Sequence, residues 1–277
     1  MPSGKIGRSR GKRRRGGPAE SFRLIGMVHL PALPGSAHAK LSMDRIVARA
    51  VDEAGQLAKA GFGAVIIENF GDAPFAADVV PPETIAAMSV VVDRVVRGCG
   101  MPVGVNVLRN DALAALAVAC ATGASFIRVN VLSGIYGTDQ GLITGRAHEL
   151  LRRRAAVAPH IRICADVHVK HAVPLSQPDL GLAAEETAYR AGADVLILSG
   201  PATGAPADLD DARRVREAVP DRPIWIGSGV TADAVADYLE LTDAVIVGTA
   251  LKRGGRTTAS LDMARVRRLA SASRRAN

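Results

Sequence analysis

The sequence predicts an α/β protein, a single (β/α)8 barrel, and three observations support this prediction. From residue 22 onward, eight short apolar runs alternate with eight helix-like segments, an order typical of parallel strands joined by right-handed crossovers. The chain has 277 residues, within the usual size of one such barrel. Hydrophobic residues make up 48% and aromatic residues only 3%, a composition that suits aliphatic parallel strands covered by helices. A doubly wound open sheet is the alternative, but eight repeats favour closure.

The expected elements follow one another at short intervals. Strands are expected at residues 24–28, 64–68, 103–107, 126–129, 161–171, 195–198, 224–226 and 244–247. The first helix is expected to begin at the cap Asp44 and to end at Gly61, and the third to begin at the cap Asn110 and to end at Gly123. The other helices are expected at 83–97, 146–157, 180–190, 208–218, 231–239 and 262–270. Together they predict one barrel domain over residues 22–272.

The fifth expected strand, residues 161–171 with the sequence IRICADVHVKH, has two different faces. With a period of two, every second residue from Ile161 is apolar, and the positions between them are polar or titratable. The second set is Arg162, Cys164, Asp166, His168 and Lys170. In a parallel barrel the apolar face packs against helices and the polar face points into the lumen, where active sites are built. The polar residues of this strand are therefore candidates for the lumen and its rim.

Polar residues recur at the carboxyl ends of five expected strands. These candidates for the lumen and its rim are His29, Glu68, Asn106, Arg128, Asn130, Asp166, His168 and Lys170. Catalytic groups contributed by several strand ends are typical of barrel enzymes. Structural ion pairing is the alternative for any one of them. Burying all eight without a ligand costs on the order of several kcal/mol unless each is paired.

Small residues after the last three strands predict a phosphate site. The residues expected to bind the phosphate are Ser199, Gly200, Gly227, Ser228, Gly229, Gly248 and Thr249. Glycine lets backbone N–H groups approach an anion, and the ends of the seventh and eighth strands commonly hold a substrate phosphate in barrels. Lys252 is expected to add a side-chain donor. Tight turns without a ligand are the alternative.

The loop at residues 130–145 is long and rich in Gly, Ser, Thr and Asp, so it is a candidate lid or binding loop. No tight spacing of metal ligands accompanies it, and the three cysteines are too far apart for a zinc site or a disulfide framework. We therefore predict no cofactor and no assigned metal, with a divalent metal left open.

The net charge of +8 falls almost wholly in a basic arm at residues 1–19, which has seven Lys and Arg residues and no acid. This arm is predicted to be disordered, because it has almost nothing apolar to bury. The rest of the chain is nearly neutral and poor in aromatic platforms, which makes a nucleic-acid partner unexpected. No apolar run approaches the roughly 20 residues that span a bilayer, so we expect a cytoplasmic protein without a membrane span. Association into a homo-oligomer through barrel helices is also expected.

Seven longer motifs resemble the BtpA/SgcQ family. They are IGMVHLPALPGS (25–36), ENFGDAPF (68–75), VGVNVLRND (103–111), GASFIRVNV (123–131), DVHVKHAVPL (166–175), SGPATG (199–204) and GSGVT (227–231). The resemblance extends from about residue 22 to about residue 269. It implies a phosphate-binding TIM barrel. One branch of the family is associated with photosystem I biogenesis and another is encoded among sugar-phosphate functions.

The residues and the resemblance together predict an enzyme that acts on a phosphorylated small molecule, a sugar phosphate or a nucleotide-like compound. The catalytic candidates are Asp166, Glu68, Lys170 and His29, and the candidates for substrate binding are Asn69, Asn106, Arg128, Asn130, His168 and His171. Two carboxylates could serve glycosyl transfer and N-glycoside cleavage, or act as opposed acid and base in an isomerisation. A Schiff base on Lys170 is a third chemistry. A non-catalytic assembly factor of the photosystem I type is the alternative function.

Overall fold

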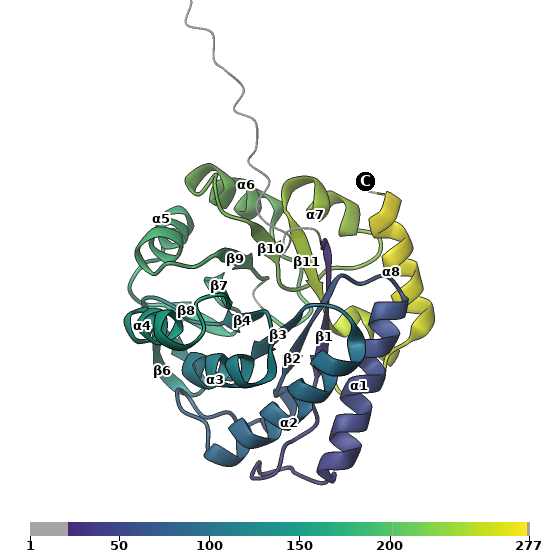
Figure 1. Cartoon of the computed structure of the whole chain (residues 1–277). Coiled ribbons are helices and arrows are strands. Elements are labelled where there is room, and N and C mark those ends of the chain that lie inside the picture. Colours follow the sequence, from purple (N-terminus) through teal and green to yellow (C-terminus); the bar gives the residue numbers. More distant parts are fainter. Residues whose placement is uncertain (1–21, 201, 276–277) are drawn as a thin grey trace, which may run out of the picture.

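The computed structural model describes residues 22–200 and 202–275, which form a closed parallel barrel surrounded by helices (Figure 1). The barrel strands are β1 (Leu24–His29), β2 (Ala64–Glu68), β3 (Val103–Asn106), β4 (Phe126–Val129), β7 (Arg162–Val167), β9 (Val195–Leu198), β10 (Ile224–Ile226) and β11 (Ala244–Val247). Strand β1 pairs with both β2 and β11, which closes the sheet. The prediction of a single (β/α)8 barrel is confirmed. The arm predicted at residues 1–19 lies outside the described residues.

The helices follow the strands in the expected order. They are α1 (Met43–Lys59), α2 (Pro82–Cys99), α3 (Ala112–Thr122), α4 (Ala147–Val157), α5 (Leu180–Glu185) with its continuation η3 (Glu186–Arg190), α6 (Leu209–Ala218), α7 (Val235–Leu241) and α8 (Met263–Arg275). Two expected caps are wrong by one or two residues, because α1 begins after Ser42 and α3 begins after Asp111. The Asp111 carboxylate accepts from the Ala114 N–H, whereas Asn110 bonds to the backbone of Val131.

The strands alternate between two separate apolar clusters. Outward positions such as Val65, Ile67 and Ile127 pack against the helices in one large core. Inward positions form a second cluster that fills the lower lumen, and its members are Phe22, Ile25, Met27, Ala64, Ile66, Phe126, Cys164, Val195, Ile197, Trp225, Ala244 and Ile246. Three of the few aromatic residues meet here. The ring centroids of Phe126 and Trp225 are 5.6 Å apart, and that of Phe22 lies 5.9 Å from Trp225.

The fifth barrel strand is shorter than the sequence predicts. Strand β7 ends at Val167, and the backbone then turns through two non-glycine residues with positive φ, His168 (φ 52°) and His171 (φ 57°). The alternation predicted over residues 161–171 is therefore wrong beyond Val167. Left-handed φ at such residues is costly and tends to occur where function requires it. Between the two turns, Lys170 is carried over the barrel mouth.

A small antiparallel sheet covers part of the mouth. It contains β5 (Ile135–Thr138), β6 (Gly141–Thr144) and β8 (Ala172–Pro174), with β5 in the centre. The loop predicted as a lid thus folds into a hairpin and pairs with the segment after β7. Its inner face contributes Tyr136 and Ile143 to a satellite core with Val131 and Val169. The hairpin is held by burial as well as by backbone pairing.

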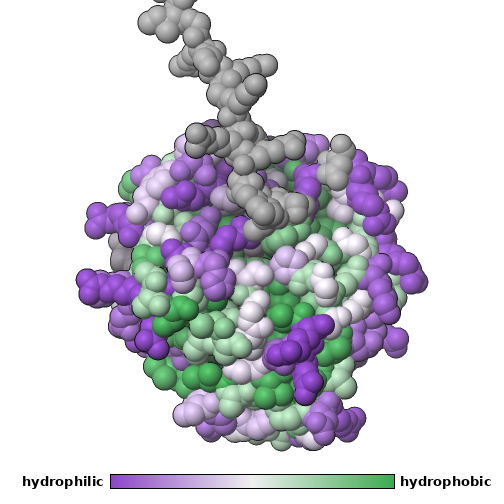
Figure 2. Space-filling model, viewed as in Figure 1, coloured by the Kyte–Doolittle hydropathy of each residue, from purple (hydrophilic) through white to green (hydrophobic). Residues whose placement is uncertain are grey.

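The surface view shows hydrophobic area over α2 and α3 and hydrophilic side chains around the edge (Figure 2). Apolar side chains of Ile85, Leu113, Leu116 and Val157 line a groove on this side. Such a groove suits association, and the homo-oligomer stays a prediction. Among the described helices, none is both long enough and apolar enough to cross a membrane.

Candidate functional site

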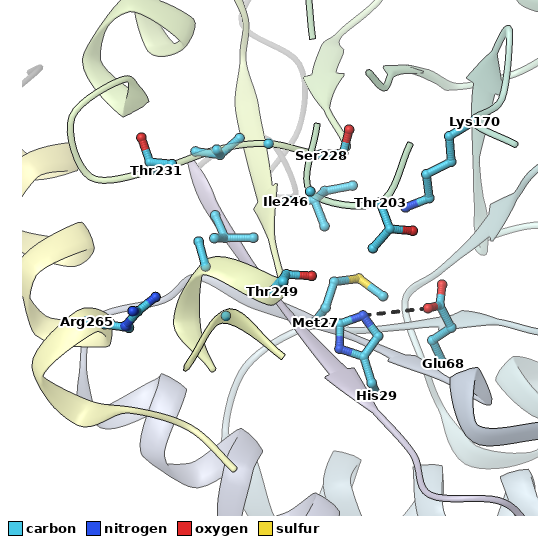
Figure 3. A pocket seen from close by; sticks show the side chains of 18 of the residues that line it. Met27, His29, Glu68, Lys170, Thr203, Ser228, Thr231, Ile246, Thr249 and Arg265 are labelled. Carbon is cyan, nitrogen blue, oxygen red and sulfur yellow. Dashed lines mark ion pairs between the residues drawn. The ribbon is translucent and has the colours of Figure 1, made fainter. Parts of the chain in front are cut away.

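Two adjoining pockets open at the carboxyl ends of the barrel strands. The first pocket, about 240 Å³, is enclosed by the loops after β10 and β11 and by Arg265 of α8 (Figure 3). The second pocket, about 390 Å³, lies under the β5–β6 hairpin and the loop after β3. Four residues line both pockets: His29, Glu68, Lys170 and Thr203. A molecule that spans the two pockets would therefore pass over three of the predicted catalytic side chains.

His29 and Glu68 form a close pair because they are the last residues of neighbouring strands in register. His29 Nε2 lies 3.7 Å from Glu68 Oε1, and both side chains are buried. Burial lowers the pKa of His29 well below its usual value, and the positive charges of Lys252 and Lys170 add to the shift. Burial raises the pKa of Glu68, against the opposing effect of Lys170. The pair is thus a neutral imidazole beside a carboxyl group that titrates closer to neutrality than usual.

Lys170 points from the loop after β7 into the space above His29 and Glu68 (Figure 3). Within the described residues its ammonium group has no hydrogen bond and no ion pair within 4.0 Å. Burial lowers its pKa, and the nearby Arg128 lowers it further. A lysine in this setting can neutralise a developing negative charge on a ligand.

Asp166 is held by its neighbours and does not line either pocket. Arg128 donates to both carboxylate oxygens, from Nε at 2.9 Å and from Nη2 at 2.7 Å. Asn130 donates to Oδ2 at 3.2 Å and Ser199 to Oδ1 at 3.1 Å. All four donors are aimed at one buried carboxylate, so Asp166 serves here to fix Arg128, whose side chain does border the first pocket.

Two of the three predicted asparagines support this network. Asn106 donates to Asn130 Oδ1 at 3.0 Å, and Asn130 in turn reaches Asp166 and borders the second pocket. Asn69 bonds instead to the loop after β3. Its side chain accepts from the Leu108 N–H at 2.7 Å and donates to the Leu108 carbonyl at 3.3 Å. Of these three residues, only Asn130 lines a pocket.

The two predicted histidines of the loop after β7 are placed differently. His168 Nε2 lies 2.9 Å from the Gln177 carbonyl oxygen, and the ring sits with Ser199 in a third, separate pocket. The structure does not bring His168 to the His29–Glu68 pair. His171 lines the second pocket, where its Nε2 accepts from the Thr203 N–H at 3.1 Å and so joins the loops after β7 and β9.

The predicted phosphate residues line the first pocket in part. Gly227, Ser228, Gly229, Gly248 and Thr249 all contribute to its wall. Ser228 Oγ is already bonded, since it accepts from the Gly200 N–H at 2.8 Å and donates to the Ala205 carbonyl. At Gly248 a Cβ atom would lie 2.7 Å from His29 Cε1, so a side chain there would displace the imidazole. Glycine is required for this close approach.

Lys252 is not available to the first pocket. Its side chain is fully buried and forms an ion pair with Glu53 of α1. The expectation that Lys252 adds a phosphate donor is therefore wrong. Arg265, on the first turn of α8, takes that place at the pocket wall. The available signal in the sequence was its position at the start of the helix that follows the phosphate loops.

Arg109 is a second residue that the sequence interpretation missed. It follows β3, is 6% exposed and lines the second pocket. Its Nη2 donates to the Lys170 carbonyl oxygen at 2.7 Å, and burial lowers its pKa. Its place just after a strand end was the available signal.

Within the described residues, no group of three or more His, Cys, Asp or Glu side chains is arranged to hold a metal ion. Cys164 is fully buried in the lower lumen, and burial raises the pKa of its thiol.

A model of the BtpA family matches residues 21–275. The chain belongs to the BtpA family. It is 46% identical over 243 residues to the photosystem I biogenesis protein BtpA of Synechocystis, with 88% of this chain and 85% of the relative covered. It is 32% identical over 246 residues to the putative sgc region protein SgcQ of Escherichia coli, with 88% and 91% covered.

Solved structures support the fold of this BtpA-family chain. The phosphoribosyl anthranilate isomerase from Thermus thermophilus superposes with a TM-score of 0.53 at 11% identity, and 92% of this chain and all of that one are covered. KGPDC from Streptococcus mutans superposes with a TM-score of 0.57 at 10% identity, with 92% and 98% covered. At these identities the likeness shows the shared barrel alone.

Proposed function

We propose that this BtpA-family protein is an enzyme that transfers protons on a phosphorylated small molecule, as in the isomerisation of a sugar phosphate. One observation carries the proposal: the His29–Glu68 pair and the unpaired Lys170 face the same space between two pockets. A carboxyl group with a raised pKa is suited to act as a general base near neutral pH.

The phosphate of the substrate is assigned to the first pocket. Gly229 and Gly248 line this pocket with backbone that carries no side chain, and Arg265 adds a positive charge at the same wall. Arg265 lies on the far side of the pocket from Lys170 (Figure 3). The reacting carbon then lies above Glu68.

The proton transfer proceeds through the residues at the pocket junction. The Glu68 carboxylate takes a proton from the carbon next to a carbonyl group. The electron pair of that C–H bond forms the C=C bond of an enediolate, and the carbonyl oxygen becomes the oxyanion. The Lys170 ammonium stabilises the oxyanion, and neutral His29 moves a proton between the two oxygens. Glu68 returns its proton to the neighbouring carbon, so no other reactant is consumed.

Glycosyl transfer and N-glycoside cleavage fit this geometry less well. Those reactions use two carboxyl groups that flank the bond to be broken. Of the two predicted carboxylates, Glu68 lines the pockets, whereas the oxygens of Asp166 are occupied by Arg128, Asn130 and Ser199.

Solvent exchange tests the proposal. The protein is incubated in D2O with a panel of phosphorylated ketoses and aldoses, and NMR follows deuterium incorporation next to the carbonyl group. We expect exchange with at least one compound and its loss, by about a hundredfold or more, in Glu68→Gln. The surface variant Glu149→Gln is the matched control. Exchange that is absent throughout, or equal in Glu68→Gln, would overturn the proposal.

A second candidate function is an assembly role, favoured by the 46% identity to a protein named for photosystem I biogenesis. Such a role does not need Glu68 or Lys170. If complementation of a BtpA-deficient strain by this chain survives both Glu68→Gln and Lys170→Met, the assembly role is supported and the enzymatic role is not.

A further inference from the structure

The cations around the barrel mouth fall into two groups. Arg128 and Lys252 are buried and each is paired with a carboxylate, Asp166 and Glu53 respectively. Arg109 and Lys170 form no ion pair within 4.0 Å among residues 22–200 and 202–275. A cation that is partly buried without an ion pair is costly, so a protein that keeps one usually has a ligand anion for it.

These two cations face one pocket from different elements. Arg109 comes from the loop after β3 and Lys170 from the loop after β7, and the hydrogen bond from Arg109 to the Lys170 carbonyl joins these two loops. The guanidinium uses one of its five N–H groups in this bond, which leaves others for a ligand. Two acids border the same pocket, Glu68 and Asp139, and neither forms an ion pair with Arg109 or Lys170.

We infer that the second pocket binds a carboxylate of the same substrate whose phosphate lies in the first pocket. This inference rests on the proposed function and narrows the substrate class to a phosphorylated hydroxy keto acid, because the proton transfer needs a carbonyl group next to a hydroxyl-bearing carbon. Because the two pockets share His29, Glu68, Lys170 and Thr203, the carbon that reacts lies between the two anionic ends.

Charge balance favours a carboxylate over a second phosphate. Arg109 and Lys170 supply two positive charges and ionised Glu68 supplies one negative charge, while the Asp139 carboxylate is exposed to solvent and its charge is screened. One carboxylate makes the three inner charges neutral, whereas a phosphate dianion would leave excess negative charge in a partly buried site. The planar guanidinium of Arg109 also matches the two oxygens of a carboxylate.

Paired ligands of matched length test the inference. Straight-chain alkyl phosphates of increasing length are compared by calorimetry with the same chains ending in a carboxylate. At the best length we expect the carboxylate to tighten binding by about tenfold or more. Arg109→Gln should remove this gain and leave the affinity for alkyl phosphates unchanged. Arg265→Gln should weaken both ligand types alike.

Matched variants separate these effects from general damage. Arg152→Gln and Arg267→Gln change exposed arginines on α4 and α8 and should leave both affinities unchanged. If Arg109→Gln fails to fold, Arg109→Lys serves, and it should reduce the carboxylate gain without affecting alkyl phosphate binding. The inference is overturned if the terminal carboxylate tightens binding at no chain length, or if the tighter binding survives replacement of Arg109. In either case, binding of the alkyl phosphates would still support a phosphate site in the first pocket. Failure of every phosphate compound to bind overturns both proposals.

Discussion

The lower and upper halves of the barrel lumen are made by the same strands but follow different rules. Below, the inward positions are apolar and end in the aromatic cluster of Phe22, Phe126 and Trp225. Two residues further along several strands, the inward positions become polar, as in the steps from Phe126 to Arg128 and from Cys164 to Asp166. The period of two therefore gives these strands one residue for the apolar cluster and a later one for the polar upper half.

The upper half is itself divided. Asp166 and Arg128 satisfy each other, whereas among the residues that the structure describes the Lys170 ammonium group forms no hydrogen bond or ion pair and the Glu68 carboxyl group has only the His29 imidazole at 3.7 Å. Polar groups that are satisfied contribute to a defined structure, and groups that are left open are available to a ligand. The lumen therefore has three layers: the apolar cluster, the satisfied polar groups above it, and the open polar groups at the mouth.

The largest effect is expected in the lower lumen. Phe126→Ala removes a fully buried ring and leaves a cavity, so the free energy of unfolding should fall by about 3–5 kcal/mol. Ligand binding at the mouth should be retained under conditions in which the variant is folded. Urea unfolding followed by circular dichroism measures the change, and a loss below about 1 kcal/mol would contradict the assignment of this cluster as the stabilising layer.

A loss nearly as large is expected at the satisfied pair. Asp166→Asn leaves the Arg128 guanidinium buried without its counter-charge, which should cost about 3 kcal/mol of unfolding free energy. Glu68→Gln, at a carboxyl group that has no such partner, should cost less than about 1 kcal/mol. Equal losses in parallel urea titrations would remove the distinction between satisfied and open groups.

A smaller, pH-dependent effect is expected at His29. Its folded-state pKa lies well below the usual 6.5, so below about pH 6.5 the unfolded chain binds a proton that the folded protein does not. The stability that neutral His29 supplies is full above this pH and falls as the pH drops towards the folded pKa, by at most about 1.4 kcal/mol per pH unit.

The matched variant for this effect is His29→Asn, which removes the titration. Glu68 shifts stability with the opposite sign, because its raised pKa supplies stability that is lost as the pH rises. The Glu68 contribution is nearly the same in wild type and in His29→Asn, so it cancels when their free energies of unfolding are compared at each pH. A stability difference that stays constant from neutral to acidic pH would show that His29 is not buried in its neutral form.

The parts of this site that the sequence predicted are those governed by strand periodicity. His29, Glu68 and Arg128 lie at strand ends, where a period of two and a closed barrel determine their direction. Residues beyond the strands escaped prediction for specific reasons. His168 turns away because its backbone takes a φ of 52°, which the sequence does not announce in a residue other than glycine.

Long-range pairing explains the other differences. Lys252 forms an ion pair with Glu53, which is 199 residues away in the sequence. Thr138 of the mouth hairpin pairs with Ala172 of the segment after β7. Such contacts follow from the assembled fold and have no local signature. Arg109 and Arg265 were missed because a loop and a helix, not a strand, position them.

Lys170→Met tests most directly the claim that the open charges at the mouth serve a ligand. If they do, they cost stability in the free protein, and the variant should be more stable than wild type by about 1 kcal/mol while losing the stabilisation that a phosphorylated ligand gives. Melting temperatures measured with and without ligand give both quantities. A Lys170→Met protein that is less stable than wild type without ligand, and that keeps its full response to the ligand, would contradict the account.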